Sequence, residues 1–387
     1  MKVSVRASLR LTIAVATVLL LSAAIAISQD NPSGPYPSPA GQVGQGFTVQ
    51  DFYGGQIVGY GVDQFGSEGV LSEYVEQSNG NLLIATETFN QATGRVLAVV
   101  ERVTGTHDNF VTLGVVGTHI GLREWEHVQG LYVHNISFNT MNPLSGNRMN
   151  GNWLPPINSN TQFLDDVEGA QGNPNVVVMV QNKTCCGRSV FGSNVAANRF
   201  GPIITLQDPL FNGGVPPLLA YDSVTDQAVL AQAQGAPYST PEIGLVDLST
   251  RNVTEFTGLG DGFINGLAVD PSTGIACTTT ETDNAAEFYN LATHTGFEVE
   301  LPVIGRYSGA AVTVDPVNHL FLITHPVPFA PGQIHVYDEN GHLIESLFNF
   351  RIGPAGAAIA LNPGTRTGFI QAAGSNGNPA ALQSFTY

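Results

Sequence analysis

The sequence contains very little positive charge, and this absence excludes whole classes of partner. Only Lys2 and Lys183 are lysines, and 14 Lys and Arg residues stand against 31 Asp and Glu residues, for a net charge of −17. So acidic a surface repels phosphate backbones and anionic lipid headgroups. The sequence therefore argues against nucleic-acid partners and against binding to a membrane surface.

The sequence also lacks the local motifs of common enzymes and cofactor sites. It has no G-x-S-x-G, H-E-x-x-H, P-loop, C-x-x-C-H or EF-hand pattern. Each of these motifs brings reactive or metal-binding groups together within a short segment. The nine histidines are scattered, and a single histidine on a strand is more often structural than functional. Any catalytic or binding groups must therefore be brought together by the fold.

Cysteine is scarce, with three residues at Cys185, Cys186 and Cys277. Cys277 lies within the apolar strand expected over Ile275–Thr280, so we predict that it is a small buried hydrophobe. The adjacent pair has two open interpretations, a strained disulfide between neighbours or two free thiols, and we predict the Cys185–Cys186 disulfide. A metal site at this pair is disfavoured because no further Cys or His lies at ligand spacing nearby.

The N-terminus has the pattern of a secretory signal peptide. Lys2, Arg6 and Arg10 precede an apolar run over Leu11–Ala26, and small residues follow at the cleavage positions. The alternative of a membrane anchor is disfavoured because the run is shorter than the ~20 residues that a membrane span needs. We predict a signal peptide over residues 1–28, a secreted or periplasmic location and no membrane insertion after cleavage. The mature net charge would be 11 − 31 = −20.

The rest of the chain divides into a short leader and one domain. Residues 29–45 are rich in Pro and Gly, cannot pack into a core and are predicted to be flexible. Residues 46–387 are predicted to form a single β-propeller domain, on the evidence of the repeats below. A hydrophobic content of 43% with 44 glycines suits a core made of short strands and turns.

One pattern occurs three times in the C-terminal part of the chain. Leu267–Thr280, Val312–Thr324 and Ile359–Ile370 each contain an apolar strand, an Asx-Pro turn and a second apolar strand. The Asp or Asn side chain bonds its own backbone two residues on, and Pro fixes φ, so the pair closes a tight turn. With similar turns upstream, the anchors of the repeat are 76–80, 127–130, 171–175, Asp222, Asp270, Asp315 and Asn362.

The spacing of these anchors predicts the architecture. Their mean step is (362 − 76)/6 = 47.7 residues, which is typical of β-propeller blades with four short strands each. We therefore predict an all-β fold, a seven-bladed β-propeller of four-stranded antiparallel blades. The last repeat lacks its outer strand, and an open sheet edge invites aggregation. We expect an N-terminal strand, from Phe47–Phe52 or Gln56–Tyr60, to close the ring.

Polar side chains follow the apolar part of the second strand in several repeats, and others precede the first strands. Equivalent blades should gather these positions on one face of the ring, as a concave site for a sugar, a small polar ligand or Ca²⁺. The competing interpretation is that strand ends are polar because they meet water. The predicted ligand-binding residues are Glu87, His134, Asn135, Asp166, Asn182, Asn265, Glu281, Asp283, Arg306 and His325.

The repeat resembles that of a known group of propellers. Ala268-Val-Asp-Pro-Ser-Thr-Gly274, followed by an apolar strand, and Ile334-His-Val-Tyr-Asp338 are similar to the repeat of secreted YVTN and NHL-type β-propellers. The resemblance covers the last three or four repeats, and its motifs are structural, so it implies the fold and says little about activity. Such propellers include binding modules and, in the gluconolactonase-like branch, metal-dependent lactone hydrolases.

Two functions remain open at this point. The first is an extracytoplasmic binding or scaffold propeller, a monomer whose polar face holds a protein or a small polar ligand. The second, implied by the resemblance, is a secreted lactonase-like hydrolase that uses Ca²⁺ or another divalent metal on the same face. A stoichiometric metal would favour the second function.

Overall fold

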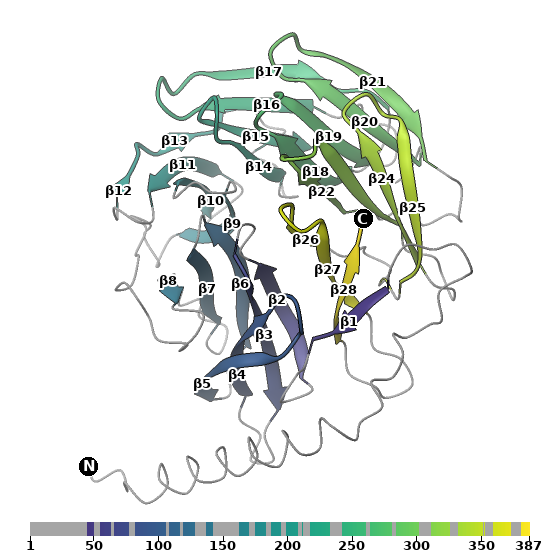
Figure 1. Ribbon diagram of the computed structural model, residues 1–387. Helices are drawn as coiled ribbons and strands as arrows, with labels where there is room; N and C mark the ends of the chain where they lie inside the picture. The colour runs from purple at the N-terminus through teal and green to yellow at the C-terminus, as the bar shows by residue number, and fades with distance from the viewer. Residues whose placement is uncertain are drawn as a thin grey trace, which may run out of the picture.

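The computed structural model of the chain consists of antiparallel β-sheets (Figure 1). The residues that it describes are 45–49, 55–62, 66–76, 82–105, 108–116, 119–127, 137–141, 162–169, 175–182, 187–194, 199–207, 211, 217–232, 242–260, 264–280, 284–301, 311–325, 332–350, 352, 359–372 and 381–387. Within these ranges every regular element is a strand, and there is no helix with the length and apolar character to cross a membrane.

The sheets are numbered here along the chain. Sheet 1 contains β2 (Gln56–Val62), β3 (Glu68–Glu76), β4 (Leu82–Asn90) and β5 (Val96–Gly105). Sheet 2 contains, among the described residues, β6 (Asp108–Val116), β7 (His119–His127) and β8 (Ser137–Met141). Sheet 3 contains β9 (Gln162–Gly169), β10 (Asn175–Asn182), β11 (Arg188–Asn194), β12 (Arg199–Phe200) and β13 (Ile204–Thr205).

The C-terminal half continues the same order. Sheet 4 contains β14 (Leu218–Asp222), β15 (Gln227–Gln232), β16 (Glu242–Asp247) and β17 (Val253–Thr257). Sheet 5 contains β18 (Ile264–Asp270), β19 (Ile275–Thr280), β20 (Ala285–Asn290) and β21 (Thr295–Glu300). Sheet 6 contains β22 (Val312–Asp315), β23 (Leu320–His325), β24 (Gly332–Asp338) and β25 (Leu343–Phe350). Sheet 7 contains β26 (Ile359–Asn362), β27 (Thr367–Ala372), β28 (Ala381–Thr386) and β1 (Gln45–Thr48).

The prediction of an all-β fold made of repeated four-stranded antiparallel sheets is confirmed. In the described part of the chain, five sheets have four strands in hydrogen-bonded order, and sheet 3 has the same order of four with β13 added beside β11. The repeats Leu267–Thr280 and Val312–Thr324 correspond to β18–β19 of sheet 5 and β22–β23 of sheet 6. The repeat Ile359–Ile370 corresponds to β26–β27 of sheet 7.

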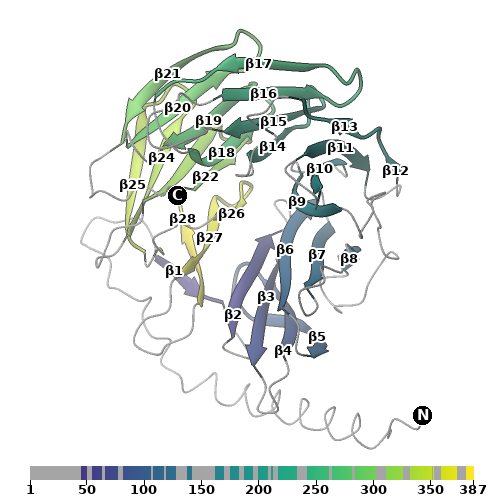
Figure 2. The same ribbon diagram turned by 180° about the vertical axis from the view of Figure 1, so that it is seen from behind.

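The sheets stand side by side around a common centre (Figures 1 and 2). The innermost strands of sheets 1 to 7 are β2, β6, β9, β14, β18, β22 and β26. The first strands of successive sheets contact one another, as β14 does β18 and β18 does β22, and β26 contacts β2. The core consists of apolar layers between neighbouring sheets. One layer, for example, joins Cys277 and Phe288 of sheet 5 to Phe321 and Tyr337 of sheet 6.

This arrangement explains why some strands are apolar throughout and others are not. Sheets 4 to 7 each pack against a neighbour on both of their faces, so a central strand of these sheets is buried on both sides. All six residues of β23 are buried accordingly, whereas most of the outer strand β21 is exposed. Fully burying one Leu, Ile or Phe side chain contributes about 1.5–3 kcal/mol, so the central strands carry most of the hydrophobic stabilisation.

Two of the predicted anchors are wrong by one strand. Residues 76–80 begin at the last residue of β3 and precede β4, so in the chain they come between the second and third strands of sheet 1. Residues 127–130 likewise begin at the last residue of β7 and precede β8 of sheet 2. A polar turn followed by an apolar strand can occur at more than one hairpin of an antiparallel sheet, so this pattern does not by itself identify the first turn of a repeat.

The strand β1 is the N-terminal segment that pairs with the last strand of the chain. The backbone N–H of Phe47 donates to Ser384 Oγ at 2.8 Å, and the N–H of Val49 donates to the carbonyl of Leu382 at 2.8 Å. The second candidate segment, Gln56–Tyr60, belongs to β2 and is the inner strand of sheet 1. The predicted signal peptide (1–28) lies outside the described residues, as does the predicted leader apart from Gln45.

Candidate functional site

The repeated Asx residues form the turns that the sequence predicts. The Oδ1 atom of Asp270 accepts the backbone N–H of Ser272 at 2.9 Å. Oδ1 of Asp315 accepts the N–H of Val317 at 2.9 Å and that of Asn318 at 3.0 Å. Equivalent bonds are made by Asp222 and Asn362. Because Oδ1 satisfies the turn, the second side-chain atom of each Asx is left to interact elsewhere.

That second atom bonds to the next sheet in three consecutive repeats. Oδ2 of Asp270 lies 2.8 Å from Nδ1 of His319, and Oδ2 of Asp315 accepts the hydroxyl of Tyr387 at 2.8 Å. Nδ2 of Asn362 donates to Oε1 of Gln91 in sheet 1 at 2.8 Å. These contacts bring the first turns of sheets 5 to 7 (270–274, 315–319 and 362–366) to the same end of the sheets. The equivalent first turn of sheet 4 is 222–226, and we call the end of the sheets that carries these four turns the turn face.

One position in each of these turns has a left-handed backbone. Asp226, Gly274, His319 and Arg366 have φ values of 56°, 68°, 55° and 51°. Gly is the usual residue at positive φ, and Asp, Asn and His are the more tolerated alternatives. A non-Gly residue held in this conformation is a reason to look for a function of its side chain. Asp226 and His319 each lie at a junction between two sheets with polar groups gathered around it.

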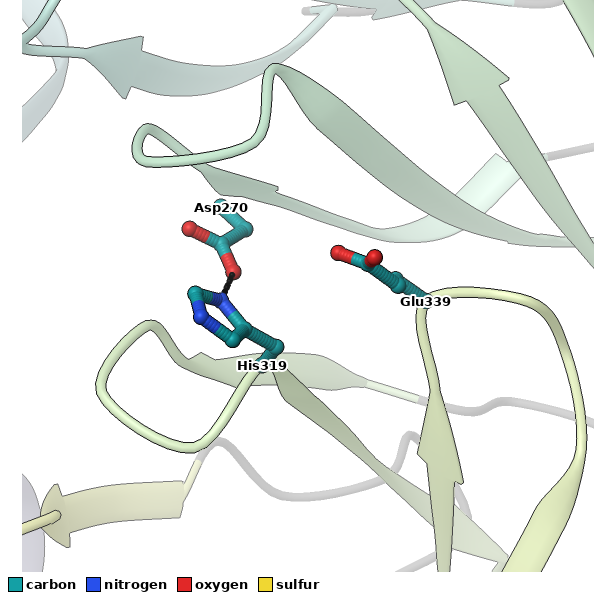
Figure 3. Close-up of side chains that lie close together, drawn as sticks. All are labelled: Asp270, His319 and Glu339. Atoms are coloured by element: carbon teal, nitrogen blue, oxygen red, sulfur yellow. Dashed lines mark hydrogen bonds and ion pairs between the residues drawn. The ribbon is translucent and has the colours of Figure 1, made fainter.

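The first junction, between sheets 5 and 6, holds three side chains that we call the Asp–His–Glu cluster (Figure 3). Asp270 ends β18, His319 lies in the β22–β23 turn, and Glu339 lies in the β24–β25 turn. Ligand-type atoms of the three residues all lie within 4.8 Å of one another. The Asp270 side chain is wholly buried, whereas that of His319 is 46% exposed.

The electrostatics of this cluster favour a charged imidazole. The hydrogen bond to Asp270 raises the pKa of His319, and the nearby carboxylates of Asp270, Glu339 and Asp315 raise it further, against a smaller lowering by burial. Ser272 Oγ also lies 3.3 Å from the same Nδ1 atom. Asp270 and His319 therefore form a hydrogen bond between two sheets, with the carboxylate of Glu339 beside it.

The second junction, between sheets 3 and 4, contains a pocket of about 230 Å³ that we call the junction pocket. Asn194 Nδ2 donates to Asn175 Oδ1 at 2.7 Å, and the hydroxyl of Tyr221 donates to Asp226 Oδ1 at 2.8 Å. Burial and the bond to Asp226 raise the pKa of Tyr221, so its hydroxyl remains a donor. The pocket is lined by Asn175, Gly192, Ser193, Asn194, Arg199, Phe200, Gly201, Tyr221, Asp226 and Leu248.

The structure places the predicted ligand-binding residues in different surroundings. Glu87 lies in β4, the third strand of sheet 1, and is fully buried, so its predicted position at the exposed end of a second strand is wrong. Asp166 lies within β9 and is half-buried. Asn182 ends β10 and Asn265 is the second residue of β18, both at the end opposite the turn face.

His325 is the predicted residue with the most informative environment. It ends β23 and is 2% exposed, and so is His335 of β24, which sequence reasoning missed. Their ring centroids are 5.0 Å apart in an edge-to-face arrangement. Burial lowers the pKa of both imidazoles to about 4, and the proximity of His325 adds to the effect on His335. Both are therefore neutral at pH 7 and belong to the interior.

The remaining predicted residues cannot be placed. His134, Asn135, Glu281, Asp283, Arg306 and the Cys185–Cys186 pair lie outside the described residues. Cys277 is buried between sheets 5 and 6, as predicted. Sequence reasoning also missed Asp226, His319 and Glu339. The first two could have been found by aligning the repeats, because they stand where the signature turn has Gly274.

Comparisons with known proteins identify the fold. The chain matches no protein-family model and no curated protein sequence. Among solved structures it is similar to the Dos1 propeller, with a TM-score of 0.54 and 10% sequence identity over 88% of this chain and 94% of that one. It is also similar to Raptor of Chaetomium thermophilum, with a TM-score of 0.58 and 10% identity over 89% of this chain and 29% of that one. At this identity the similarity shows a β-propeller fold alone.

Proposed function

We propose that this β-propeller is an extracytoplasmic binding protein that holds a small, neutral, polar ligand in the junction pocket. The ring would have seven blades and would be closed by β1. Contacts of the inner strands support this count, because they lead from sheet to sheet and return from β26 to β2. The closure is supported by the pairing of β1 with β28 and by the apolar layer between Phe369 of sheet 7 and Phe89 of sheet 1.

The observation that carries the proposal is the chemistry of the junction pocket. Binding sites for small molecules are concave and combine apolar surface with a few well-placed polar groups. Here the apolar surface comes from Phe200, and the polar groups are amides, a carboxylate and the exposed guanidinium of Arg199. Amide groups can donate to and accept from neighbouring hydroxyls, and a carboxylate can accept from them. An aromatic ring can cover the C–H face of a sugar ring. A sugar is therefore the ligand class that fits.

Size and charge are consistent with this class. A pocket of about 230 Å³ corresponds to roughly eight waters at about 30 Å³ each, which suits one or two sugar units rather than a long chain. Arg199 and Asp226 offer one charge of each sign within the pocket. The excess of 31 acidic over 14 basic residues in the whole chain opposes an anionic ligand such as a phosphate.

The site differs from the one expected from the sequence. The expected face carries Asn182, Asn265 and His325, whereas the junction pocket opens at the turn face, beside the 222–226 turn. Three members of its lining, Asn175, Tyr221 and Asp226, lie at the first turns of sheets 3 and 4. These turns are the parts of the repeat in which side chains vary while the strand geometry is kept.

Binding of simple sugars to the purified chain tests the proposal. Glucose, galactose and N-acetylglucosamine are titrated separately and followed by calorimetry and by protein NMR shifts. We expect saturable binding of at least one sugar, and about tenfold weaker binding after Phe200→Ala, which corresponds to about 1.4 kcal/mol. Phe297→Ala is the matched control, because Phe297 is an exposed phenylalanine on β21, outside the pocket. Absence of saturable binding for all three sugars, or equal affinity of the Phe200 variant, would refute the proposal.

A further inference from the structure

The Asp–His–Glu cluster is separate from the junction pocket and shares no residue with it. Two carboxylates and an imidazole converge from two sheets onto one point of the turn face (Figure 3). These are the oxygen and nitrogen ligands that proteins offer to divalent transition metals. The convergence is produced by the repeat itself, since Asp270 and His319 occupy fixed positions in consecutive first turns.

The charges of the cluster are not balanced by its own residues. Asp270 is wholly buried, and Oε2 of Glu339 is a buried atom that has no hydrogen-bond partner among the described residues. A buried carboxylate oxygen without a donor is costly, and a second carboxylate nearby adds repulsion. Two carboxylates and one imidazole thus lie within 4.8 Å of one another. A divalent cation would balance both carboxylates and satisfy the Glu339 oxygen.

We propose that the Asp–His–Glu cluster binds one divalent transition-metal ion of the Zn²⁺ type and thereby links sheets 5 and 6. The ligands are Oδ2 of Asp270, Nδ1 of His319 and a carboxylate oxygen of Glu339. Three protein ligands leave a fourth position for water in the tetrahedral geometry that Zn²⁺ prefers. Nδ1 of His319 must be unprotonated to bind the ion, so binding displaces any proton that this atom carries.

The imidazole decides which class of ion fits. Ca²⁺ and Mg²⁺ prefer sites made wholly of oxygen ligands, and Ca²⁺ takes six to eight of them. A site with one nitrogen and two carboxylates instead suits Zn²⁺ and its first-row neighbours. The metal expected from the structure therefore differs from the Ca²⁺ considered from the sequence. This inference does not depend on the proposed sugar site, and either can fail without the other.

The chain contains a built-in control for this site. Asp338 and His342, in the β24–β25 turn, form a similar pair, with Oδ2 and Nδ1 2.9 Å apart. His342 is 75% exposed, and no third ligand joins this pair among the described residues. A general affinity of surface histidines for metals would affect both pairs, whereas a built site would affect the Asp–His–Glu cluster alone.

Zinc titration of the untagged, EDTA-treated protein tests the proposal. We expect calorimetry to show one Zn²⁺ ion per chain, bound at least tenfold more tightly than Ca²⁺. His319→Asn and Glu339→Gln should each weaken zinc binding at least tenfold, and His342→Asn should leave it unchanged. Asn tolerates the positive φ of residue 319, and circular dichroism checks that the fold is kept. Glu339→Gln provides a second test that leaves the left-handed residue untouched.

Three results would overturn the metal site. One is the absence of stoichiometric Zn²⁺ binding to the wild-type chain. Another is an equal loss of binding in the His342 variant, which would indicate nonspecific surface coordination. The third is Ca²⁺ binding as tight as that of Zn²⁺. None of these results bears on sugar binding, which is measured on the same protein by the Phe200 variant.

Discussion

Mild acid should destabilise this protein through two buried histidines of sheet 6. His325 and His335 are each 2% exposed, and the Nε2 atoms of both have no hydrogen-bond partner among the described residues. Nδ1 of His335 lies 2.9 Å from Ser346 Oγ. Within the described part of the chain, neither Nε2 atom can therefore share a positive charge with a partner, and burial lowers both pKa values from 6.5 to about 4.

The direction of the effect follows from these pKa values. The unfolded chain binds protons at both histidines below pH 6.5, whereas the folded chain does so only near pH 4. Stability is therefore intact above pH 6.5 and is lost as the pH falls from there towards 4. The difference between a pKa of 6.5 in the unfolded chain and about 4 in the folded chain corresponds to at most about 3.4 kcal/mol of stability per histidine. At pH 5.0 the loss is about 2 kcal/mol each, or about 4 kcal/mol for the pair.

Urea unfolding at pH 7.5 and pH 5.0 measures this loss. His325→Phe and His335→Phe keep an aromatic ring and remove one titrating group, so each variant should lose about 2 kcal/mol less than the wild type between the two pH values. Other titrating groups cancel in this comparison. His342→Phe, on the exposed turn of the same sheet, controls for the substitution itself. If both buried variants lose as much stability as the wild type, the two imidazoles are not neutral inside the fold.

Two further predictions concern the N-terminal strand and the adjacent cysteines. Deleting residues 45–49 removes the partner of β28 and exposes an unpaired edge, so the melting temperature should fall and aggregation should increase; an unchanged melting temperature would contradict the closure. The Cys185–Cys186 disulfide stays a prediction, and the unreduced protein should be about 2 Da lighter than its dithiol form. Alkylation of both thiols under denaturing, non-reducing conditions would disprove it.

The sequence predicted the C-terminal repeats well because their turns have a specific chemistry. An Asx followed by Pro can close only a tight turn, and Asp270, Asp315 and Asn362 do so in the structure through their Oδ1 atoms. The N-terminal repeats lack this signature. There the anchor at 76–80 was chosen from the polarity of its residues alone, and other hairpins share this polarity. The anchor falls between β3 and β4 instead of between β2 and β3. That error placed Glu87 at an exposed strand end, although it is buried within β4.

The candidate sites were harder to predict because they form between sheets. Asp270 and His319 are 49 residues apart, and their hydrogen bond depends on how two sheets pack. The repeat contained part of this information, since His319 and Asp226 replace the glycine of the signature turn. Nothing in the sequence around Glu339 indicates that its carboxylate turns towards the preceding sheet. The apolar residues that precede His325 in β23 could indicate that His325 is buried. They do not indicate that His335 of β24 lies beside it.

The pairing of β1 with β28 also fixes when the fold can be completed. Sheets 1 to 6 each consist of strands that follow one another in the chain, so each can form as soon as its own segment has been synthesised. The bonds between Phe47 and Ser384 join residues 337 positions apart, and closing so long a loop costs about 5 kcal/mol of chain entropy. The first strand made must therefore wait for the last. A chain that ends before β28 leaves β1 without its partner strand and sheet 7 incomplete.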